Sequence, residues 1–350
     1  MTNPFTLAFG MIPAQFISRP SQTNQIIENF TADTPSTPIY MISGVRGSGK
    51  TVMLTTISKD LSARDEWVVV ELNPEADLMS SLVSKLYNFE KIKPLFVKAK
   101  INLSLNSSGV TLDNNIHNTT NDVILEKMLQ ILKKQNKRLL IAIDEVTNIE
   151  YIKNFSHEFQ ILIRKEYNVY MIMTGLYENI HDLQNEKTLT FLYRAPKIIL
   201  EPLNLPRISM VYSNIFNITD SESNAMAKLT QGYPFAFQVL GYLSWENPMI
   251  SHEELISRYD HYLADYVYDK IWHELSDTDK LIIGAMITGS DYIKIQVVRE
   301  AVGMASNQFS QHREKLIRKG IVDTSKYGYI KLTLPRFKEY AERQIEFDSL

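Results

Sequence analysis

The chain has 350 residues, 44% of them hydrophobic and 22% charged, which is typical of a soluble globular protein with two or three domains. Its formal net charge of −3 excludes a global attraction to nucleic acid or anionic membranes, and the lack of cysteine excludes disulfides and thiolate metal sites. The sequence has no signal-like start and no apolar stretch of eighteen residues, so we expect a cytoplasmic protein without membrane partners.

Strands and helices alternate through the first part of the chain. Near-continuous apolar runs predict strands at 38–44, 67–72, 138–145 and 169–176, and helical patterns lie between them. Strands that are buried on both faces and alternate with helices predict a parallel sheet in an α/β domain.

Residues 89–122 interrupt this alternation as an insertion. Within it, residues 101–112 alternate apolar and polar side chains around Asn106-Ser107-Ser108-Gly109, which predicts a β-hairpin. The Asn-rich stretch 113–122 predicts a loop. The composition does not decide between a partner-docking element and a decorated loop.

The segment GVRGSGKT at 44–51 joins the first strand to a helical pattern. Its spacing fits G-x-x-x-x-G-K-[ST], in which backbone N–H groups surround phosphates, the lysine reaches the terminal ones and the hydroxyl ligates Mg²⁺. The same letters can also form only a turn, so the context has to decide. The candidate nucleotide contacts are Gly44, Val45, Arg46, Gly47, Ser48, Gly49, Lys50, Thr51 and Val52.

Asp144 and Glu145 end the predicted strand 138–145. In P-loop enzymes such an aspartate holds Mg²⁺ together with the loop hydroxyl, here Thr51, and a following glutamate orients and deprotonates the attacking water. A charged strand end or an acidic helix start explains the pair about equally well when it is taken alone. The glycine loop upstream favours the catalytic interpretation.

Three further polar residues are candidates for phosphate contacts. Thr174 ends the strand 169–176, where a hydroxyl can bind the γ-phosphate or the attacking water, although an ordinary Thr-Gly strand exit is an equal alternative. Arg46 lies in the glycine loop, where it can contact phosphate. Arg194 can also contact phosphate, or act as an arginine finger on the nucleotide of a neighbouring subunit. Most surface arginines do neither. The candidate catalytic set is therefore Lys50, Glu145, Thr174 and Arg194.

Helical patterns replace the strands after residue 203. They lie at 206–217, 220–231, 234–246 and 252–273, and then at 277–288, 293–302 and 306–319. Two β-rich stretches follow around Ser325-Lys326-Tyr327-Gly328. Three helices followed by a hairpin predict a winged helix-turn-helix at the C-terminus.

These residues together resemble the AAA+ and STAND-like P-loop ATPases, especially bacterial proteins similar to archaeal origin-recognition-type ATPases. The resemblance spans nearly the whole chain and implies a P-loop ATPase α/β domain at 1–203, a helical lid domain at 204–273 and a winged-helix domain at 274–350. It also implies ATP or ADP with Mg²⁺ as cofactors.

The resemblance assigns residues outside the glycine loop as well. It implies that Ile12, Pro13 and Phe16 lie near the adenine, and that Gly232 and Pro234 in GYPFAFQVL form a Gly-x-Pro element that places the lid over the nucleotide. A plain helix-to-helix turn also explains this element. Where many AAA+ proteins carry a sensor arginine at the start of the lid helix, this stretch has none, which favours slow hydrolysis.

The C-terminal module carries a local excess of positive charge. Residues 306–338 contain eight lysines and arginines against two acids, a net +6, which predicts salt-dependent contact with duplex DNA. A solvated basic face on a module that binds only protein is the alternative. The candidate DNA contacts are Asn307, Gln308, Gln311, Arg313, Lys326 and Tyr327.

Two functions therefore compete. In the first, the chain is an ATPase in which nucleotide binds between the α/β and helical domains and controls a DNA-binding winged helix. In the second, it is a STAND-type signalling switch that regulates a protein partner or its own association without binding DNA. A non-hydrolysing adaptor is disfavoured because both Asp144 and Glu145 are present.

Overall fold

The structure, a computed structural model, describes residues 2–8, 10, 12–99, 101, 103–106, 109–112, 120–289 and 291–348. They form two compact units, each described by itself below. The sheet unit consists of the described parts of Arg19–Ser43 and Lys50–Ile199, and the helical unit of those of Met1–Ser18, Gly44–Gly49 and Leu200–Leu350. The division into three domains stays a prediction.

A five-stranded parallel sheet forms the centre of the sheet unit. Its strands are β1 (Ile39–Ser43), β2 (Trp67–Leu72), β5 (Arg138–Ile143), β6 (Val169–Gly175) and β7 (Lys197–Ile199), in the order β2-β5-β6-β1-β7. Every residue of β1 and β6 is buried, which confirms the predicted α/β sheet with strands covered on both faces. The sequence pattern does not predict β7, because three residues are too few to show a period.

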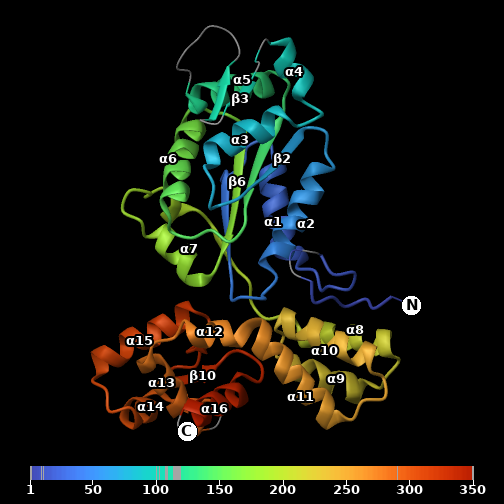
Figure 1. The fold of residues 1–350 in the computed structure, drawn as a ribbon, viewed down its shortest axis with the longest axis vertical. Helices are drawn as coiled ribbons and strands as arrows, with labels where there is room; N and C mark the ends of the chain where they lie inside the picture. Colours follow the sequence, from blue (N-terminus) through green and yellow to red (C-terminus); the bar gives the residue numbers. More distant parts are fainter. Residues whose placement is uncertain are drawn as a thin grey trace. The chain divides into compact units, whose positions relative to one another are not determined.

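Helices cover both faces of this sheet. In Figure 1, α1 (Pro20–Thr31) and α2 (Lys50–Ser62) lie on one side of β6, and α6 (Glu150–Arg164) lies on the other. Two further helices, α3 (Leu78–Tyr87) and α5 (Asn121–Lys134), pack against each other, and α3 also packs against α6. The short helix α7 (Tyr177–Gln184) packs against β1 and β6. The apolar faces of these helices and the strands share one hydrophobic core.

The insertion begins as part of this core. Ile92, Phe96 and Ile101 are buried in it, with α4 spanning Lys93–Lys98. The predicted hairpin is confirmed as β3 (Leu103–Asn106) and β4 (Gly109–Leu112), which pair antiparallel, while Ser107, Ser108 and residues 113–119 lie outside the described residues. The predicted loop is two residues too long: α5 begins at Asn121, after the N-cap Thr120 and with acidic Asp122 in its first turn.

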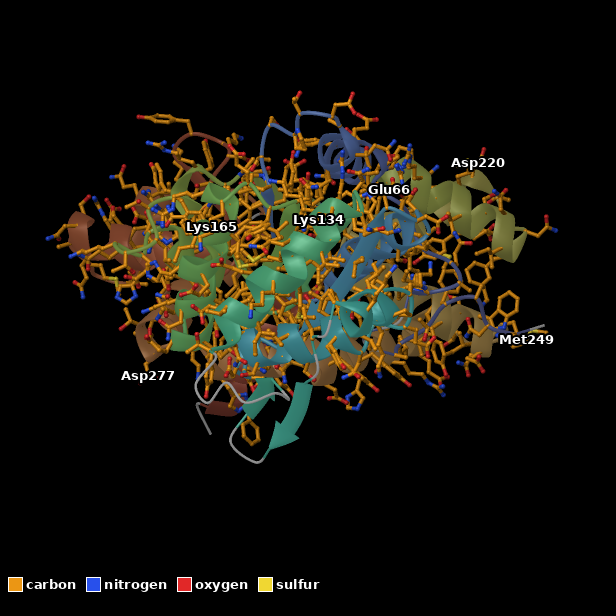
Figure 2. The ribbon with its side chains drawn as sticks, turned by 90° about the horizontal axis from the view of Figure 1, so that it is seen from above. Glu66, Lys134, Lys165, Asp220, Met249 and Asp277 are labelled. Atoms are coloured by element: carbon orange, nitrogen blue, oxygen red, sulfur yellow. The ribbon has the colours of Figure 1, made fainter. Side chains whose placement is uncertain are left out.

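The helical unit contains the predicted helices between residues 204 and 273. They are α8 (Leu205–Phe216), α9 (Asp220–Thr230), α10 (Pro234–Glu246), α11 (His252–Leu263) and α12 (Asp269–His273). Figure 2 labels Asp220, the first residue of α9, and Met249, which follows α10. The predicted single helix 252–273 is wrong in its middle, where the π-helical turn η2 (Ala264–Tyr268) separates α11 from α12.

The C-terminal part of this unit contains the three predicted helices and the two predicted β-stretches in order, together with a short strand and a last helix that the sequence patterns did not predict. It runs α13 (Asp277–Ile287), β8 (Ile293–Lys294), α14 (Ile295–Ala301), α15 (Ser306–Arg318), β9 (Val322–Asp323), β10 (Tyr329–Leu332) and α16 (Phe337–Asp348). The three strands form a small sheet in the order β8-β10-β9. Residues 293 and 294, predicted as helix, therefore pair with β10 instead. The assignment of this C-terminal part as a winged helix remains a prediction.

The N-terminal segment packs against α10. Phe5 lies so close to Gly241 that a Cβ at Gly241 would approach the Phe5 ring to 2.5 Å. Gln238 accepts a hydrogen bond from the Thr6 backbone at 3.1 Å and donates one to the carbonyl of Gln15 at 2.7 Å. Residues 2–18 therefore belong with the helices that follow residue 200.

No helix within the described ranges is both long enough and apolar enough to cross a membrane.

Candidate functional site

The sheet order brings the predicted catalytic side chains to one edge. β6 lies between β1 and β5, with Ser43 paired to Gly175 and Ile143 paired to Met173. Because all three strands are parallel, their carboxyl ends meet at the same edge of the sheet. Thr174 near the end of β6 and Asp144 directly after β5 consequently lie side by side.

Asp144 is the centre of a hydrogen-bonded cluster at this edge. Its Oδ2 accepts from the hydroxyl of Thr51, the second residue of α2, at 2.6 Å. Its Oδ1 accepts from the hydroxyl of Thr174 and from the backbone N–H of Glu145, the latter at 3.0 Å. One carboxylate is thus fixed by groups from three elements, and Thr174 itself is fully buried.

The donor set of this cluster fits magnesium. A carboxylate and a hydroxyl oxygen are hard ligands, and Mg²⁺ in nucleotide sites takes one or two protein oxygens and completes its shell with phosphate and water. Within the described ranges, no group of three or more His, Asp or Glu side chains can hold a metal ion.

Glu145 adopts a strained backbone conformation next to the cluster. Its φ is +55°, in the left-handed region that costs an ordinary residue about 1–2 kcal/mol. The conformation is held because the N–H of Val146 donates to the carbonyl of Thr174 at 2.8 Å. The side chain of Glu145 is exposed.

The glycine loop between β1 and α2 has a tight internal turn, in which the N–H of Ser48 donates to the carbonyl of Val45 at 3.2 Å. Gly47 has φ +73°, a conformation that side chains disfavour. The hydroxyl of Ser48 is buried and has no hydrogen-bond partner among the described residues. A buried hydroxyl without a partner is costly, and a phosphate oxygen is a group that would satisfy it.

Lys50 and Val52 follow the loop on α2. Lys50 is the first residue of the helix, and it is buried at 8% exposure. Val52 is half-buried in the first turn.

The Gly-x-Pro element forms the turn between α9 and α10. Gly232 has φ +77°, and a Cβ there would meet the carbonyl oxygen of Leu203 at 2.5 Å, so this position requires glycine. The N–H of Leu203 also donates to the carbonyl of Gly232 at 2.7 Å. Pro234 is the first residue of α10, where its missing N–H costs nothing.

Tyr233, the middle residue of this element, was missed in the sequence. Its hydroxyl donates to the backbone carbonyl of Arg46 in the glycine loop. Burial raises the pKa of Tyr233 far above its usual range, although the nearby Arg46 lowers it slightly, so the hydroxyl keeps its proton. A tyrosine between glycine and proline does not by itself predict this contact, because Tyr233 and Arg46 are 187 positions apart in the sequence and meet only in the folded chain.

The remaining predicted nucleotide and catalytic residues lie in different environments. In the N-terminal segment, Pro13 is buried while Ile12 and Phe16 are half-buried. Arg194 is exposed at the end of the 3-10 turn η1 (Leu192–Arg194) in the sheet unit. None of these placements by itself identifies a ligand.

The predicted DNA contacts lie on α15 and between β9 and β10. Asn307, Gln308 and Gln311 are exposed, and Arg313 is half-buried. Lys326 and Tyr327 are exposed in the turn before β10, where Tyr327 is 99% exposed. The Lys326 ammonium lies 4.3 Å from the centroid of the Tyr329 ring, which is a cation–π distance.

Acidic residues outside the segment offset part of its positive charge. Five of its eight cations lie within 4.0 Å of a carboxylate: Lys315 of Asp279, Arg318 of Glu314, Lys319 of Glu274, Lys331 of Asp323 and Arg336 of Asp260. Glu274, Asp279 and Asp260 were not part of the count over 306–338. The net charge of +6 counted over residues 306–338 therefore overstates the positive electrostatic potential that this segment presents to DNA.

Comparison with known proteins places this geometry in a family context. Residues 19–156 match the KAP family P-loop domain, and residues 265–341 match DUF8462, a domain of unknown function. No significant match to a curated protein was found.

Several solved structures share the fold over nearly the whole chain. The Walker-type ATPase PABY2304 of Pyrococcus abyssi has a TM-score of 0.67 at 15% identity and covers 93% of this chain and 96% of its own. The Aeropyrum pernix ORC2 protein, solved as ADPNP-ADP complexes, has a TM-score of 0.63 at 13% identity, with 98% and 97% covered. Cdc6p from Pyrobaculum aerophilum has a TM-score of 0.50 at 13% identity, with 97% of each chain covered. These matches confirm the predicted resemblance in fold to the archaeal origin-recognition proteins.

Proposed function

We propose that this P-loop NTPase, which shares the fold of the ORC and Cdc6 proteins, binds Mg²⁺-ATP, hydrolyses it slowly and uses the nucleotide state to control its C-terminal module. The observation that carries the proposal is the cluster of Thr51, Asp144 and Thr174 at the carboxyl edge of the sheet. A loop of the phosphate-binding pattern leads directly into Thr51, so the hydroxyl and the loop belong to one chain segment.

Each residue of the proposed site has a separate task. The loop N–H groups and Lys50 bind the phosphates, and Thr51 with Asp144 would hold Mg²⁺, which neutralises charge on the phosphate oxygens when bound. Glu145 orients the attacking water and takes its proton. Thr174 keeps Asp144 oriented through its hydroxyl hydrogen bond. The exposed Arg194 is available to a neighbouring subunit as an arginine finger.

We propose that the N-terminal segment binds the adenine base of the nucleotide. Ile12, Pro13 and Phe16 supply apolar surface of the kind that an adenine ring packs against. The segment belongs to the same compact unit as the Gly-x-Pro element, and Gln238 of α10 holds it through two hydrogen bonds. We therefore propose that Gly232 and Pro234, together with the N-terminal segment, place the helical part of the chain over the nucleotide.

We propose that the C-terminal module is a winged helix that binds duplex DNA. Asn307, Gln308 and Gln311 near the start of α15 are exposed amides, which can contact base edges. The exposed Lys326 and Tyr327 lie in the turn before β10, where a wing contacts the sugar–phosphate backbone. Arg313, which is half-buried on the same helix, is proposed as a further DNA contact through its guanidinium.

The competing function is a signalling switch that regulates a protein partner. One observation favours it: five of the eight cations in 306–338 have a carboxylate within 4.0 Å. Cations that are already paired release fewer counterions from DNA, and the expected affinity falls accordingly.

ATP turnover measured with and without duplex DNA separates the two functions. The DNA-linked ATPase predicts that duplex DNA stimulates turnover and that the double variant Lys326→Ala/Tyr327→Ala loses the stimulation while its basal rate is unchanged. Turnover that is indifferent to DNA selects the signalling switch. The absence of any ATP binding in the wild type would reject both.

A further inference from the structure

We infer that Tyr233 is a positioning residue for the phosphate loop: its hydroxyl fixes the orientation of the peptide between Arg46 and Gly47. This inference rests on the proposed nucleotide site and adds a residue that acts through the loop. It starts from the hydrogen bond in which Tyr233 donates to the carbonyl oxygen of Arg46. The two residues are 187 positions apart in the sequence.

The hydrogen bond sets the direction of a loop amide. In a planar trans peptide the carbonyl and the following N–H point in opposite directions, and the described residues contain no cis peptide. A carbonyl of Arg46 that is held toward Tyr233 therefore directs the N–H of Gly47 to the opposite side of the peptide. Loop N–H groups bind phosphate, so Tyr233 decides which way one of them faces.

The ring of Tyr233 restricts the same peptide sterically. A Cβ at Gly47 would lie 2.4 Å from the Tyr233 hydroxyl oxygen and 2.9 Å from the Cβ of Phe235. The two aromatic residues thus form a wall beside the loop that leaves room only for glycine. With its φ of +73°, Gly47 could otherwise populate several conformations, and the wall selects among them.

Tyr233 itself is held firmly enough to act as a fixed reference. Its backbone N–H donates to the carbonyl of Thr230 at 2.8 Å, and its own carbonyl accepts from Phe237 at 3.0 Å. Its side chain is buried and belongs to the core of the helical unit. The donor is consequently preorganised by α10, so that little ordering is required when the loop binds a ligand.

The test compares Tyr233→Phe with a matched variant, Tyr212→Phe. Tyr212 is also buried in the helical unit and also donates to a backbone carbonyl, but to that of Phe237 at 2.8 Å rather than to one in the loop. Both variants lose one buried hydroxyl, so a merely structural role predicts similar losses of thermal stability and equal nucleotide affinity.

Calorimetric titration with Mg²⁺-ADP and amide hydrogen exchange provide the two readouts. We expect Tyr233→Phe to weaken ADP binding about tenfold, the worth of one well-placed hydrogen bond, and to speed exchange in residues 44–49 of the nucleotide-free protein. Tyr212→Phe should do neither. Wild-type affinity and wild-type exchange in Tyr233→Phe would overturn the inference while leaving the nucleotide site intact. A wild-type protein that binds no ADP would overturn the proposed function and the inference together.

Discussion

The hydroxyl of Thr51 donates to Oδ2 of Asp144 at 2.6 Å, across 93 residues of sequence. Thr51 is the second residue of α2, the helix that follows the glycine loop, and Asp144 follows β5, which is two strands away from β1 in the sheet. The strand between them, β6, supplies Thr174 to the other oxygen of the same carboxylate. The sheet order therefore brings the proposed magnesium ligands together.

Removing the Thr51 hydroxyl should abolish the magnesium-dependent part of ATP binding. Thr51→Val keeps the shape of the side chain but removes the oxygen that would ligate the ion, so added Mg²⁺ should no longer tighten ATP binding. The measurement is the ATP affinity with and without Mg²⁺. Thr56→Val is the matched control, because Thr56 lies on the same helix and its hydroxyl donates to the carbonyl of Val52 at 2.7 Å. An unchanged Mg²⁺ effect in Thr51→Val would reject Thr51 as a ligand.

Glu145→Gln should separate binding from turnover. The amide cannot take a proton from water, so the turnover rate should fall about 100-fold or more while ATP affinity stays near that of the wild type. Single-turnover hydrolysis at saturating Mg²⁺-ATP measures this directly. Glu150→Gln, an exposed substitution at the start of α6, should hydrolyse ATP normally. Equal rates in Glu145→Gln and the wild type would exclude Glu145 as the base.

Asp279→Asn should destabilise the C-terminal module. Asp279 is 0% exposed, accepts from His312 and Lys315 at 2.7 Å each, and ties α15 to α13. Losing charge-assisted hydrogen bonds of this kind costs about 1.5–3 kcal/mol in the free energy of unfolding at neutral pH. Asp277→Asn on the same helical turn is the control, because Asp277 is exposed.

The cost of this substitution should depend on pH. Burial by itself raises the pKa of Asp279, but hydrogen bonds from Lys315, His312 and Ser276 outweigh it, so the folded pKa lies below the usual 3.8. The carboxylate consequently stabilises the fold above pH 3.8, and this contribution is lost as the pH falls through the folded pKa. Urea unfolding at a series of pH values from 7 downward should show the difference between the wild type and Asp279→Asn shrinking once the pH falls below 3.8; a difference that stays constant over the whole acidic range would contradict this account.

Much of the sheet unit could be predicted because its signals are local. Buried parallel strands such as β5 and β6 are continuous apolar runs, and the glycine loop has its own letter pattern. The rule that parallel strands end at one edge places Asp144 and Thr174 on the same side of the sheet, but their direct contact depends on the pairing of β5 with β6, which the sequence does not predict.

The contacts that cross between distant elements could not be predicted. Tyr233 meets Arg46 only because the turn between α9 and α10 lies beside the loop in the same compact unit. The partner of Lys315 is Asp279, which lies on a different helix and outside the charge count. The π-helical turn η2 leaves the apolar spacing of 252–273 almost unchanged, so periodicity predicts one continuous helix there.

The most direct test of the central claim is the equilibrium binding of Mg²⁺-ATP to the wild type and to Lys50→Ala. Lys50 begins α2 directly after the glycine loop, and its ammonium is proposed to bind the terminal phosphates. The account predicts saturable binding in the wild type, and its loss in Lys50→Ala with circular dichroism and the unfolding midpoint close to those of the wild type. Equal ATP affinity in the two proteins would show that the loop at 44–51 does not hold the phosphates.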